Sequence, residues 1–331
     1  MKKILIFGVT GQDGSLLAKY LCNKRYQIYG VTRNKNKKNL INLYKLQINK
    51  NIKLIELKNI NYNSVYKIIS QIKPVHIYNL SAQSSVSKSF VYPIQTYQSI
   101  YNLNFYILET LKNFNNKFEI KYFNACSGEC FGNIKKGLAN EKTPFNPLSP
   151  YAIAKTSSFY LVNNYRNQFN IFASNGILFN HESILRDNFY VTKKIIIGAL
   201  DIFRKKTDKL ELGNLNIYRD WGWAPEYVEA INKILNLNSP TDLIISSGKV
   251  NSLKKFIEIS FKAVGLNWKN HVIVSDKFVR KLDVHRSGGS PIRAKNLIKW
   301  KTKLKLEDIV NQLIEYEIYK QSKKNYNPTK F

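Results

Sequence analysis

Gly8-Val-Thr-Gly-Gln-Asp-Gly14 decides the fold, because it directly follows the short apolar run Lys3–Phe7 and directly precedes a helical apolar pattern over residues 16–21. Glycines at a strand-to-helix turn let the backbone come close to a pyrophosphate, which the free N–H groups and the dipole of the helix N-terminus attract. The stretch therefore predicts a dinucleotide-binding turn. Its candidate cofactor-binding residues are Gly8, Gly11, Gln12, Asp13 and Gly14.

The end of the second predicted strand indicates which dinucleotide is bound. Residues 27–31 form this strand, and Thr32-Arg33-Asn34 follows it. Dinucleotide-binding folds place an acidic residue here, roughly 20 residues after the glycine turn, to hold the ribose hydroxyls of NAD, whereas an Arg suits the 2′-phosphate of NADP. Arg33 therefore predicts NADP.

Strands and helices alternate along the first half of the chain. We expect strands at 3–7, 27–31, 52–57, 74–80, 117–126 and 171–178, and helices at 40–48, 65–72, 95–114 and 151–167. The alternation is typical of an α/β fold with a doubly wound parallel sheet of the Rossmann type. Ligands of such sheets bind at loops that follow the strands. We therefore expect Leu80 and the loop 81–89 to line the cofactor and the sugar, through Ala82, Gln83 and Ser84.

The pattern becomes irregular after residue 178, which predicts a smaller α+β substrate-binding lobe. We expect a loop entering a helix at 219–228, a strand at 243–247, and helices at 191–203, 253–264 and 306–319. The predicted division assigns 1–178, with about 216–248, to an NADP-binding Rossmann domain. It assigns 179–215 and 249–318 to a nucleotide-sugar-binding lobe, and 319–331 to a basic tail.

Four residues able to move protons follow the strand 117–126. Ser127 and Glu129 lie two apart at the strand end and would point to the same side, while Tyr151 and Lys155 lie one helical turn apart. A tyrosine is a poor base at neutral pH because its pKa of about 10 keeps the phenol protonated. A nearby cation stabilises the phenolate and lowers that pKa. The position of Lys155 therefore indicates that Tyr151 acts as the base. Tyr151 would take a proton from a sugar hydroxyl, and Ser127 would orient that hydroxyl. Glu129 could remove a proton next to a ketone and pass it to a leaving hydroxyl.

The charge of the chain is unusual for a folded protein. The 331 residues are 44% hydrophobic and 13% aromatic, which indicates a globular protein. Its 52 Lys and Arg outnumber 22 Asp and Glu, giving a formal charge of +30. A nucleic-acid surface should concentrate basic residues on one element, whereas these are spread along the chain, so we do not expect nucleic-acid binding.

The number of cysteines and the absence of long apolar stretches indicate the cellular compartment. Cys22, Cys126 and Cys130 are too few for a disulfide framework and form no Cys-x-x-Cys pair. No apolar stretch approaches the ~18 residues that a membrane span needs. We expect a cytoplasmic protein with no membrane partner and no metal site.

Several blocks of the sequence together resemble the extended short-chain dehydrogenase/reductase superfamily, and within it the GDP-mannose 4,6-dehydratases. The blocks are Gly8–Ser15, Ser127-x-Glu129, Ser149–Lys155, Gly176–Ser183, Val191–Ile195 and Arg219–Gly222, and they cover nearly the whole chain in the expected order. The resemblance implies a redox-neutral lyase reaction. NADP takes hydride from C4 of GDP-mannose, water is lost across C5 and C6, and hydride returns to C6 to give GDP-4-keto-6-deoxy-mannose.

The resemblance also implies roles for individual residues. Ser127, Glu129, Tyr151 and Lys155 would be catalytic, and Tyr151 and Lys155 would also contact the cofactor. Substrate would be bound by Ser84, Asn180, Glu182, Val191, Lys194, Arg219, Arg280 and Asp283. A diphosphate is well matched by guanidinium and ammonium groups. A homodimer is the expected assembly.

The sequence departs from the family pattern at several positions. Ser127 stands where the family has Thr and keeps the hydroxyl, Gly128 replaces a Ser, and Asp283 replaces a Glu. Lys58-Asn59 replaces a Gly-Asp that would face adenine. The loop after Arg33 lacks the second Arg and the Ser-rich stretch that contact a neighbouring subunit in the family, so the sequence does not predict a tetramer.

Two alternatives remain open at this point. The same fold and tyrosine would serve a nucleotide-sugar 4-epimerase or 4-ketoreductase, but neither has an evident need for Glu129. A non-catalytic basic protein that binds nucleic acid would not need the intact set of glycines, Tyr151 and Lys155.

Overall fold

The computed structural model describes residues 1–114, 119–278 and 283–321. Three expectations fall wholly or partly outside these ranges. They concern Arg280, residues 117–118 at the start of the fifth predicted strand, and the basic tail beyond residue 321.

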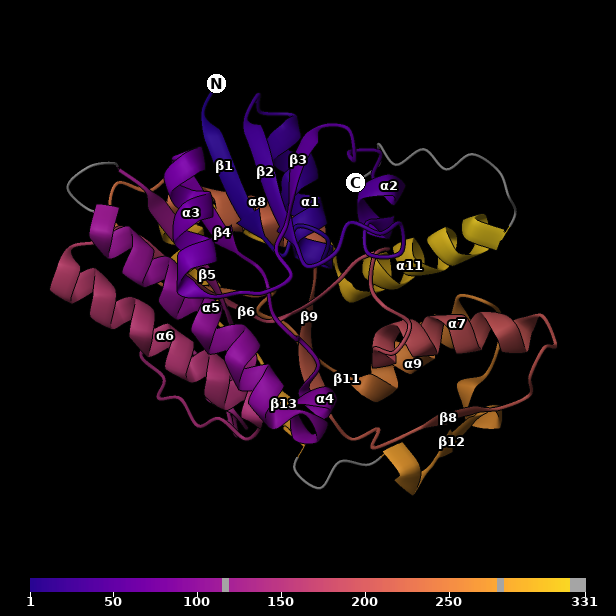
Figure 1. Cartoon of the computed structure of the whole chain (residues 1–331). Coiled ribbons are helices and arrows are strands. Elements are labelled where there is room, and N and C mark those ends of the chain that lie inside the picture. Colours follow the sequence, from indigo (N-terminus) through magenta and orange to yellow (C-terminus); the bar gives the residue numbers. More distant parts are fainter. Residues whose placement is uncertain (115–118, 279–282, 322–331) are drawn as a thin grey trace.

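A seven-stranded parallel sheet runs through the larger part of the molecule, in the order β10-β6-β5-β4-β1-β2-β3 (Figure 1). Its strands are β1 (Lys3–Phe7), β2 (Gln27–Thr32), β3 (Ile52–Glu56), β4 (His76–Asn79), β5 (Lys121–Ser127), β6 (Ala173–Leu178) and β10 (Leu243–Ile245). The chain winds outward from β1 to β3, then crosses back to β4 and winds the other way. The predicted doubly wound α/β sheet is confirmed, and its switch point lies between β1 and β4, where such sheets bind ligands.

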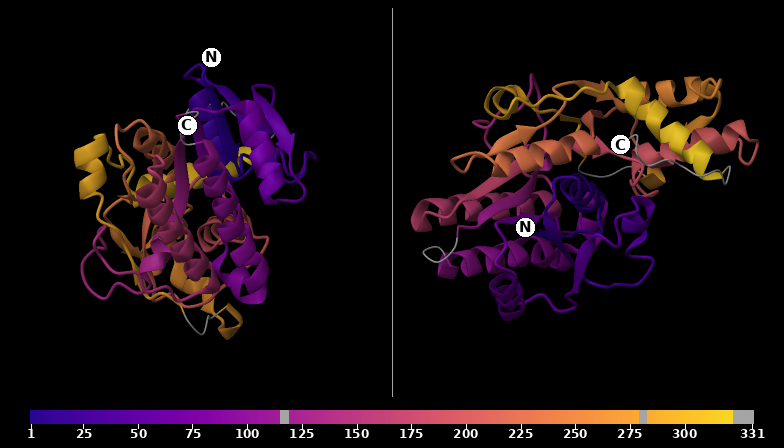
Figure 2. Two further views of the ribbon diagram at one scale, coloured as in Figure 1. Left: turned by 60° about the vertical axis from the view of Figure 1, so that its left-hand side comes forward. Right: turned by 90° about the horizontal axis from the view of Figure 1, so that it is seen from above.

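Helices cover both faces of this sheet (Figure 2). Side chains alternate between faces along a buried strand, so Ile4 and Ile6 enter one apolar cluster while Leu5 and Phe7 enter another. The first cluster contains α1 (Gln12–Cys22) and α8 (Ala224–Leu235); the second contains α3 (Tyr62–Ile72), α5 (Pro93–Phe114) and α6 (Pro150–Phe169). A short α2 (Ile41–Lys45) stands where residues 40–48 were expected to be helical.

Two loops of the sequence prediction are wrong in part. The loop 81–89 contains the start of α4 (Val86–Val91), whose N-cap Ser85 accepts a hydrogen bond from Lys88 N at 3.3 Å. Residues 219–223, expected as a loop, belong to β9 (Tyr218–Trp223), and α8 starts at Ala224. The strand was missed because its partners come from three distant segments, which no local pattern reveals.

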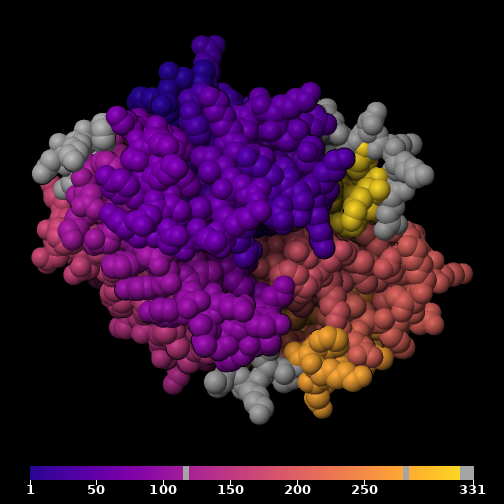
Figure 3. All heavy atoms as spheres, in the orientation of Figure 1, coloured from indigo at the N-terminus to yellow at the C-terminus, as the bar shows by residue number. Residues whose placement is uncertain are grey.

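These partners form the second sheet, which underlies the smaller lobe. β9 lies beside β7 (Asn180–Glu182), β11 (Val250–Ser252) and β13 (Arg286–Ser287). Helices α7 (Val191–Phe203), α9 (Leu253–Lys262) and α11 (Leu306–Gln321) complete the lobe. The paired strands β8 (Leu210–Leu212) and β12 (Val272–Val274) lie at its edge. Helix α10 (Ile292–Ile298) packs against α8 and β10. The space-filling view shows a hollow where this lobe meets the N-terminal part (Figure 3).

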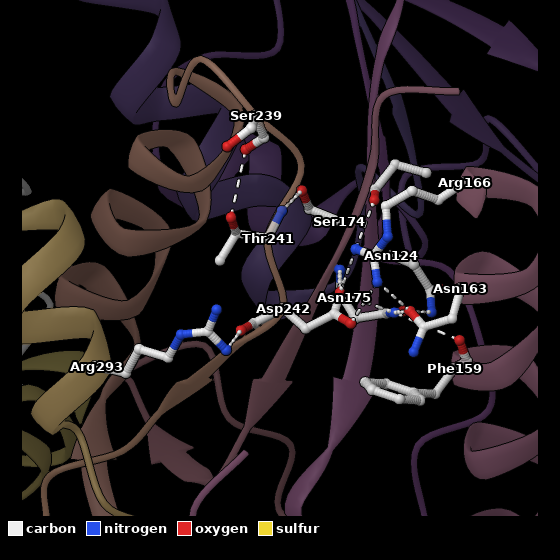
Figure 4. Close-up of polar contacts among 11 residues, drawn as sticks. Asn124, Phe159, Asn163, Arg166, Ser174, Asn175, Ser239, Thr241, Asp242 and Arg293 are labelled. Carbon is white, nitrogen blue, oxygen red and sulfur yellow. Dashed lines mark hydrogen bonds and ion pairs between the residues drawn. The ribbon is translucent and has the colours of Figure 1, made fainter. Parts of the chain in front are cut away.

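A buried polar network holds the edge strand β10 to its neighbours (Figure 4). Arg166 of α6 donates to both carboxylate oxygens of Asp242, at 2.9 and 2.8 Å, just before β10 begins. Asp242 also accepts from the Asn175 N–H of β6 at 2.9 Å. A bidentate pair fixes orientation as well as distance. The network therefore anchors the C-terminal half of α6, the helix whose first turn carries Tyr151.

No described helix combines the length and the apolar character that crossing a bilayer requires. The last helix continues to Gln321, two residues beyond its predicted end at 319.

Candidate active site

The glycine turn between β1 and α1 is too tight for side chains at two of its positions. Gly8 has φ +81°, and a Cβ there would lie 2.7 Å from Leu80 O. A Cβ on Gly14 would collide with Gly8 O. Gly11 N–H donates to Gly8 O at 3.0 Å, and Gly11 precedes α1 without a side chain to cap it. The first N–H groups of α1 thus face an open cradle that fits a diphosphate.

A cavity of about 180 Å³ opens at the carboxyl ends of β1, β2 and β4. Five of the residues predicted to bind the cofactor line it: Gly8, Gly11, Arg33, Leu80 and Ala82. Ala82 also packs beside Tyr151 in a small apolar cluster. The structure thus places the glycine turn, Arg33 and the neighbourhood of Tyr151 along one continuous surface.

The four predicted proton-transfer residues converge at the ends of β5 and α6. Ser127 is the last residue of β5, and its Oγ accepts from the Glu129 N–H at 3.2 Å in the short 3₁₀ turn η1 (Gly128–Phe131). Ser149 caps α6 by accepting from the Ala152 N–H at 3.1 Å, which orients the first turn. Lys155 Nζ donates to Ala125 O at 2.7 Å and lies 6.0 Å from the centre of the Tyr151 ring.

Burial dominates the electrostatics of this cluster. It raises the pKa of the Tyr151 phenol well above the usual value, against a hydrogen bond with Ser127, and the negative charge of Glu129 acts in the same direction as burial. Burial also lowers the pKa of Lys155. The sequence predicted that Lys155 would lower the pKa of Tyr151. In the chain by itself, burial of the phenol is the largest effect and raises the pKa of Tyr151 instead.

Two predicted cofactor residues, Gln12 and Asp13, also connect the glycine turn to β7 of the smaller lobe. Asp13 Oδ2 lies 2.9 Å from His181 Nε2 of β7, and the charge of His181 lowers the pKa of Asp13 although burial opposes it. Gln12 accepts from Ser183 Oγ at 2.8 Å and donates to His181 O at 3.2 Å. The side chains that open α1 therefore fix β7 in place.

The two strands that carry predicted substrate residues lie side by side. Asn180 of β7 stands opposite Trp221 of β9, and Arg219 is two residues before that position. Arg219 is buried and pairs with Asp283 at 3.2 Å. On the adjoining α7, Lys194 Nζ lies 3.7 Å from the centre of the Phe278 ring.

Three other predicted substrate residues have different surroundings. Glu182 is only 1% exposed, and its carboxylate pairs with Arg186 at 3.2 Å and accepts from Thr192 Oγ1 at 2.9 Å. Ser84 Oγ lies 2.7 Å from the hydroxyl of Tyr190. Val191 is exposed at the start of α7.

Sequence reasoning missed His181, Arg186 and Tyr190. Arg186 stacks on the Tyr190 ring at 3.6 Å, and the charge of Tyr190 contributes to the raised pKa of Tyr151, so this segment reaches the catalytic cluster. His181 lies inside the block Gly176–Ser183, which carried part of the family resemblance, and that position was the signal that could have identified it. Within the described residues, no three His, Cys, Asp or Glu side chains could hold a metal ion together.

Asp220, next to Arg219, gives a pH-dependent stability prediction. It is buried and accepts from Ser247 N and Oγ and from Gly248 N at 2.8, 2.6 and 2.9 Å. Burial nevertheless raises its pKa from 3.8 to about 6. Because the folded pKa is above the unfolded one, this contribution to stability is full below pH 4 and is lost as pH rises through 6, on the order of 3 kcal/mol in all.

Urea denaturation of the parent chain and of Asp220→Asn between pH 4 and 7 measures this effect. The free-energy difference between the two proteins should change in favour of Asp220→Asn as pH rises. A difference that is constant across this range contradicts the assignment.

Sequence comparisons match nearly the whole chain to known proteins. The family model described as GDP-mannose 4,6 dehydratase matches residues 5–313. GDP-mannose 4,6 dehydratase 1 of Arabidopsis thaliana is 36% identical over 96% of this chain and 90% of its own length. The Homo sapiens GDP-mannose 4,6 dehydratase is 34% identical over 95% of this chain and 91% of its own.

Solved structures share the fold at lower identity. A dTDP-glucose 4,6-dehydratase from Bacillus anthracis, in complex with NAD, superposes with a TM-score of 0.84 at 20% identity and covers 98% of both chains. A UDP-glucose 4-epimerase from Thermotoga maritima, with UDP-glucose, gives 0.83 at 20% identity over 96% of this chain and 99% of that one.

Proposed function

The chain belongs to the GDP-mannose 4,6-dehydratase family, and from that premise we propose that it converts GDP-mannose to GDP-4-keto-6-deoxy-mannose with NADP as its bound cofactor. It is a nucleotide-sugar 4,6-dehydratase, and hence a hydro-lyase. The observation that carries the proposal is the position of Glu129 in the turn after Ser127, beside Tyr151. An oxidation alone requires Tyr151 and Lys155, whereas loss of water needs a further acid and base.

The residues divide the reaction between them. A nicotinamide cofactor held by the glycine turn and Arg33 would supply the hydride acceptor for C4 and the hydride donor for C6, and its oxidised form would add positive charge to that of Lys155. Tyr151 takes the proton of the C4 hydroxyl, which Ser127 orients. The resulting ketone acidifies the C5 proton.

Glu129 removes the C5 proton and passes it to the C6 hydroxyl, which leaves as water. The proton held by Tyr151 then goes to C5 as hydride arrives at C6, which restores both side chains. Atoms and electrons balance, with water as the only other product. One carboxylate serves in turn as base and acid.

We assign nucleotide binding to the second sheet and α7. Asn180 and Arg219 lie on adjacent strands, and Lys194 and Val191 lie on the helix beside them. Ser84 contributes from the loop after β4, and Arg280, Asp283 and Glu182 complete the proposed set. In our proposal the cofactor domain comprises 1–178 with about 216–248, and the substrate lobe 179–215 with 249–318.

NADP rather than NAD is proposed from Arg33, which lines the cavity at the end of β2. A guanidinium there suits a 2′-phosphate. Since a hydrogen bond to a charged group contributes about 1.5–3 kcal/mol, Arg33→Ala should weaken NADP binding by about 10- to 100-fold and leave NAD binding nearly unchanged. Titration of both dinucleotides by fluorescence checks this prediction. Lys35→Ala, two residues farther along, is the control, and equal losses for both dinucleotides would refute the role of Arg33.

A homodimer is proposed from the outer face of α5 and α6, which lie side by side (Figure 1). Residues 93–108 and 150–164 include one charged side chain, Lys155, and it is buried. Exposed apolar side chains occupy the face instead: Ile94, Tyr97, Phe105, Ile153 and Tyr160. Two chains that each carry +30 repel one another. An uncharged aromatic face keeps like charges out of direct contact, and salt screens the more distant ones, so a second copy is the proposed occupant.

A charge introduced on this face should separate the dimer. Tyr160→Lys places an ammonium group where Tyr160 is 56% exposed, and it should weaken dimerisation by at least about 100-fold, because an unpaired buried charge costs several kcal/mol. Light scattering after size exclusion measures the mass. Tyr44→Lys, at a residue 43% exposed on α2, is the control. A dimer that survives Tyr160→Lys would refute the proposed interface.

We place the protein in the cytoplasm, because its three cysteines are free, as is common in a reducing compartment.

Incubation with GDP-mannose, a catalytic amount of NADP and no reductant tests the proposed function. Mass spectrometry should show the loss of one water from the nucleotide sugar, with no net reduction of NADP. No mass change with any nucleotide-hexose would overturn the proposal. An isomer of unchanged mass would identify an epimerase.

A further inference from the structure

Two thiols bracket the proposed catalytic residues. Cys126 directly precedes Ser127, and Cys130 directly follows Glu129. Their sulfur atoms lie 3.5 Å apart, and both side chains are almost fully buried. Neither has a part in the reaction described above. The third cysteine, Cys22, lies on α1.

The pair also contacts the helix that carries Tyr151 and Lys155. Cys126 Sγ lies 3.9 Å from Lys155 O, and Cys130 Sγ lies 3.8 Å from Ala152 O. Burial lowers the pKa of Lys155, and a negative charge on either sulfur would oppose that shift. The thiols therefore join the Glu129 turn to the first turns of α6.

We propose that Cys126 and Cys130 are a modification site, at which hydrogen peroxide converts the two thiols into a disulfide that reversibly switches off the active site. One thiol is oxidised to a sulfenic acid as the peroxide O–O bond breaks and water leaves. The second thiol attacks that sulfur, the S–S bond forms, and a second water leaves. The two thiols lose two electrons and two protons, and the peroxide is reduced to two waters.

Either thiol can form the sulfenic acid, because the other lies 3.5 Å away to capture it. Burial raises the pKa of Cys130, but hydrogen bonds with Cys126, Thr156 and the Ser127 backbone outweigh burial and lower the pKa below its ordinary value. Burial raises the pKa of Cys126. A thiolate next to a resolving thiol is the arrangement in which a sulfenic acid is captured as a disulfide.

The bond would displace Glu129 more than Ser127. Forming it brings the sulfurs from 3.5 Å to about 2.0 Å, a closure of roughly 1.5 Å. Cys126 is held within β5, opposite Ile177 of β6. Cys130 lies in η1, a single 3₁₀ turn, whose hydrogen-bond geometry is poorer than that of a sheet. The turn therefore yields, and it carries Glu129 with it.

Displacement on this scale has a large effect on turnover. A misplacement of about 1 Å can reduce a rate by about 100-fold. The disulfide also moves the two sulfurs relative to Ala152 O and Lys155 O, which they contact in the reduced protein. This consequence for turnover rests on the function proposed above, whereas formation of the disulfide does not.

Treatment of the full-length protein with hydrogen peroxide tests the inference. We expect the intact mass to fall by two hydrogen atoms, peptide mapping to link Cys126 to Cys130, and dehydratase turnover to fall by about 100-fold and return with dithiothreitol. Cys130→Ser should resist this reversible loss. Cys22→Ser should lose and regain turnover like the parent.

The outcomes separate the inference from the proposed function. If the untreated enzyme shows no water loss, the proposed function fails, and the mass and peptide map still test the disulfide. If Cys126 and Cys130 remain alkylatable after peroxide and denaturation, or if Cys130→Ser is inactivated as fast as the parent, the inference is overturned. Cys126→Ser provides the same comparison should Cys130→Ser not fold.

Discussion

Glu129→Gln should reduce water loss from GDP-mannose by about 1000-fold, within the range that general acid–base catalysis contributes. Gln keeps the size and the hydrogen-bonding reach of Glu but cannot accept the C5 proton. The hydrogen bond from the residue 129 N–H to Ser127 Oγ belongs to the backbone and should persist. Tyr151 and Lys155 remain intact, so oxidation at C4 should continue.

A single-turnover experiment distinguishes this result from general damage. The variant should accumulate the absorbance of reduced cofactor together with a 4-keto sugar that has not lost water. Glu56→Gln, at the end of β3 beside the exposed Lys58, is the matched control and should behave like the parent. Parental water loss by Glu129→Gln would refute the role of this carboxylate.

Tyr151→Phe should lower turnover by about 100- to 10,000-fold, because no other group is proposed to take the C4 hydroxyl proton. Phe preserves the ring that packs against Ile100 and Ala154, so folding and cofactor binding should be retained. In contrast to Glu129→Gln, this variant should show no reduced cofactor, since oxidation itself is blocked.

The pH dependence provides a second test of Tyr151. Burial raises the pKa of the phenol, so the deprotonated base becomes more populated as pH rises, and the turnover of the parent should increase toward alkaline pH. Tyr151→Phe should lose this limb of the profile. Tyr160→Phe, on the outer face of the same helix, is the control for loss of a hydroxyl. An unchanged profile in Tyr151→Phe would contradict the assignment.

Local sequence patterns were sufficient to predict much of the candidate site. The glycine turn could be read from the sequence because the φ of +81° at Gly8 and the collisions that a Cβ would make at Gly8 and Gly14 require glycine at fixed spacing. Tyr151 and Lys155 could be paired because a helix brings residues four apart to one face. The Ser149 cap followed from local chemistry in the same way.

Other parts depended on contacts between distant segments. β9 was expected as a loop, because its strand character comes from pairing with residues 180–182, 250–252 and 286–287. His181 had no assigned role until the fold brought it to Asp13, 168 positions away. The contact between Tyr190 and Ser84 spans 106 positions.

The sequence by itself determined the doubly wound fold and the glycine cradle, and it nominated the four proposed proton-transfer residues, because each follows from spacing along one strand, turn or helix. Only the tertiary structure decided the electrostatic state of those residues. Burial depends on every segment packed around a side chain, so the raised pKa of Tyr151 and the lowered pKa of Lys155 could not be read from their spacing. The contact between Cys126 and Cys130 could not be read from the sequence either, because it depends on the conformation of the turn η1 that follows β5.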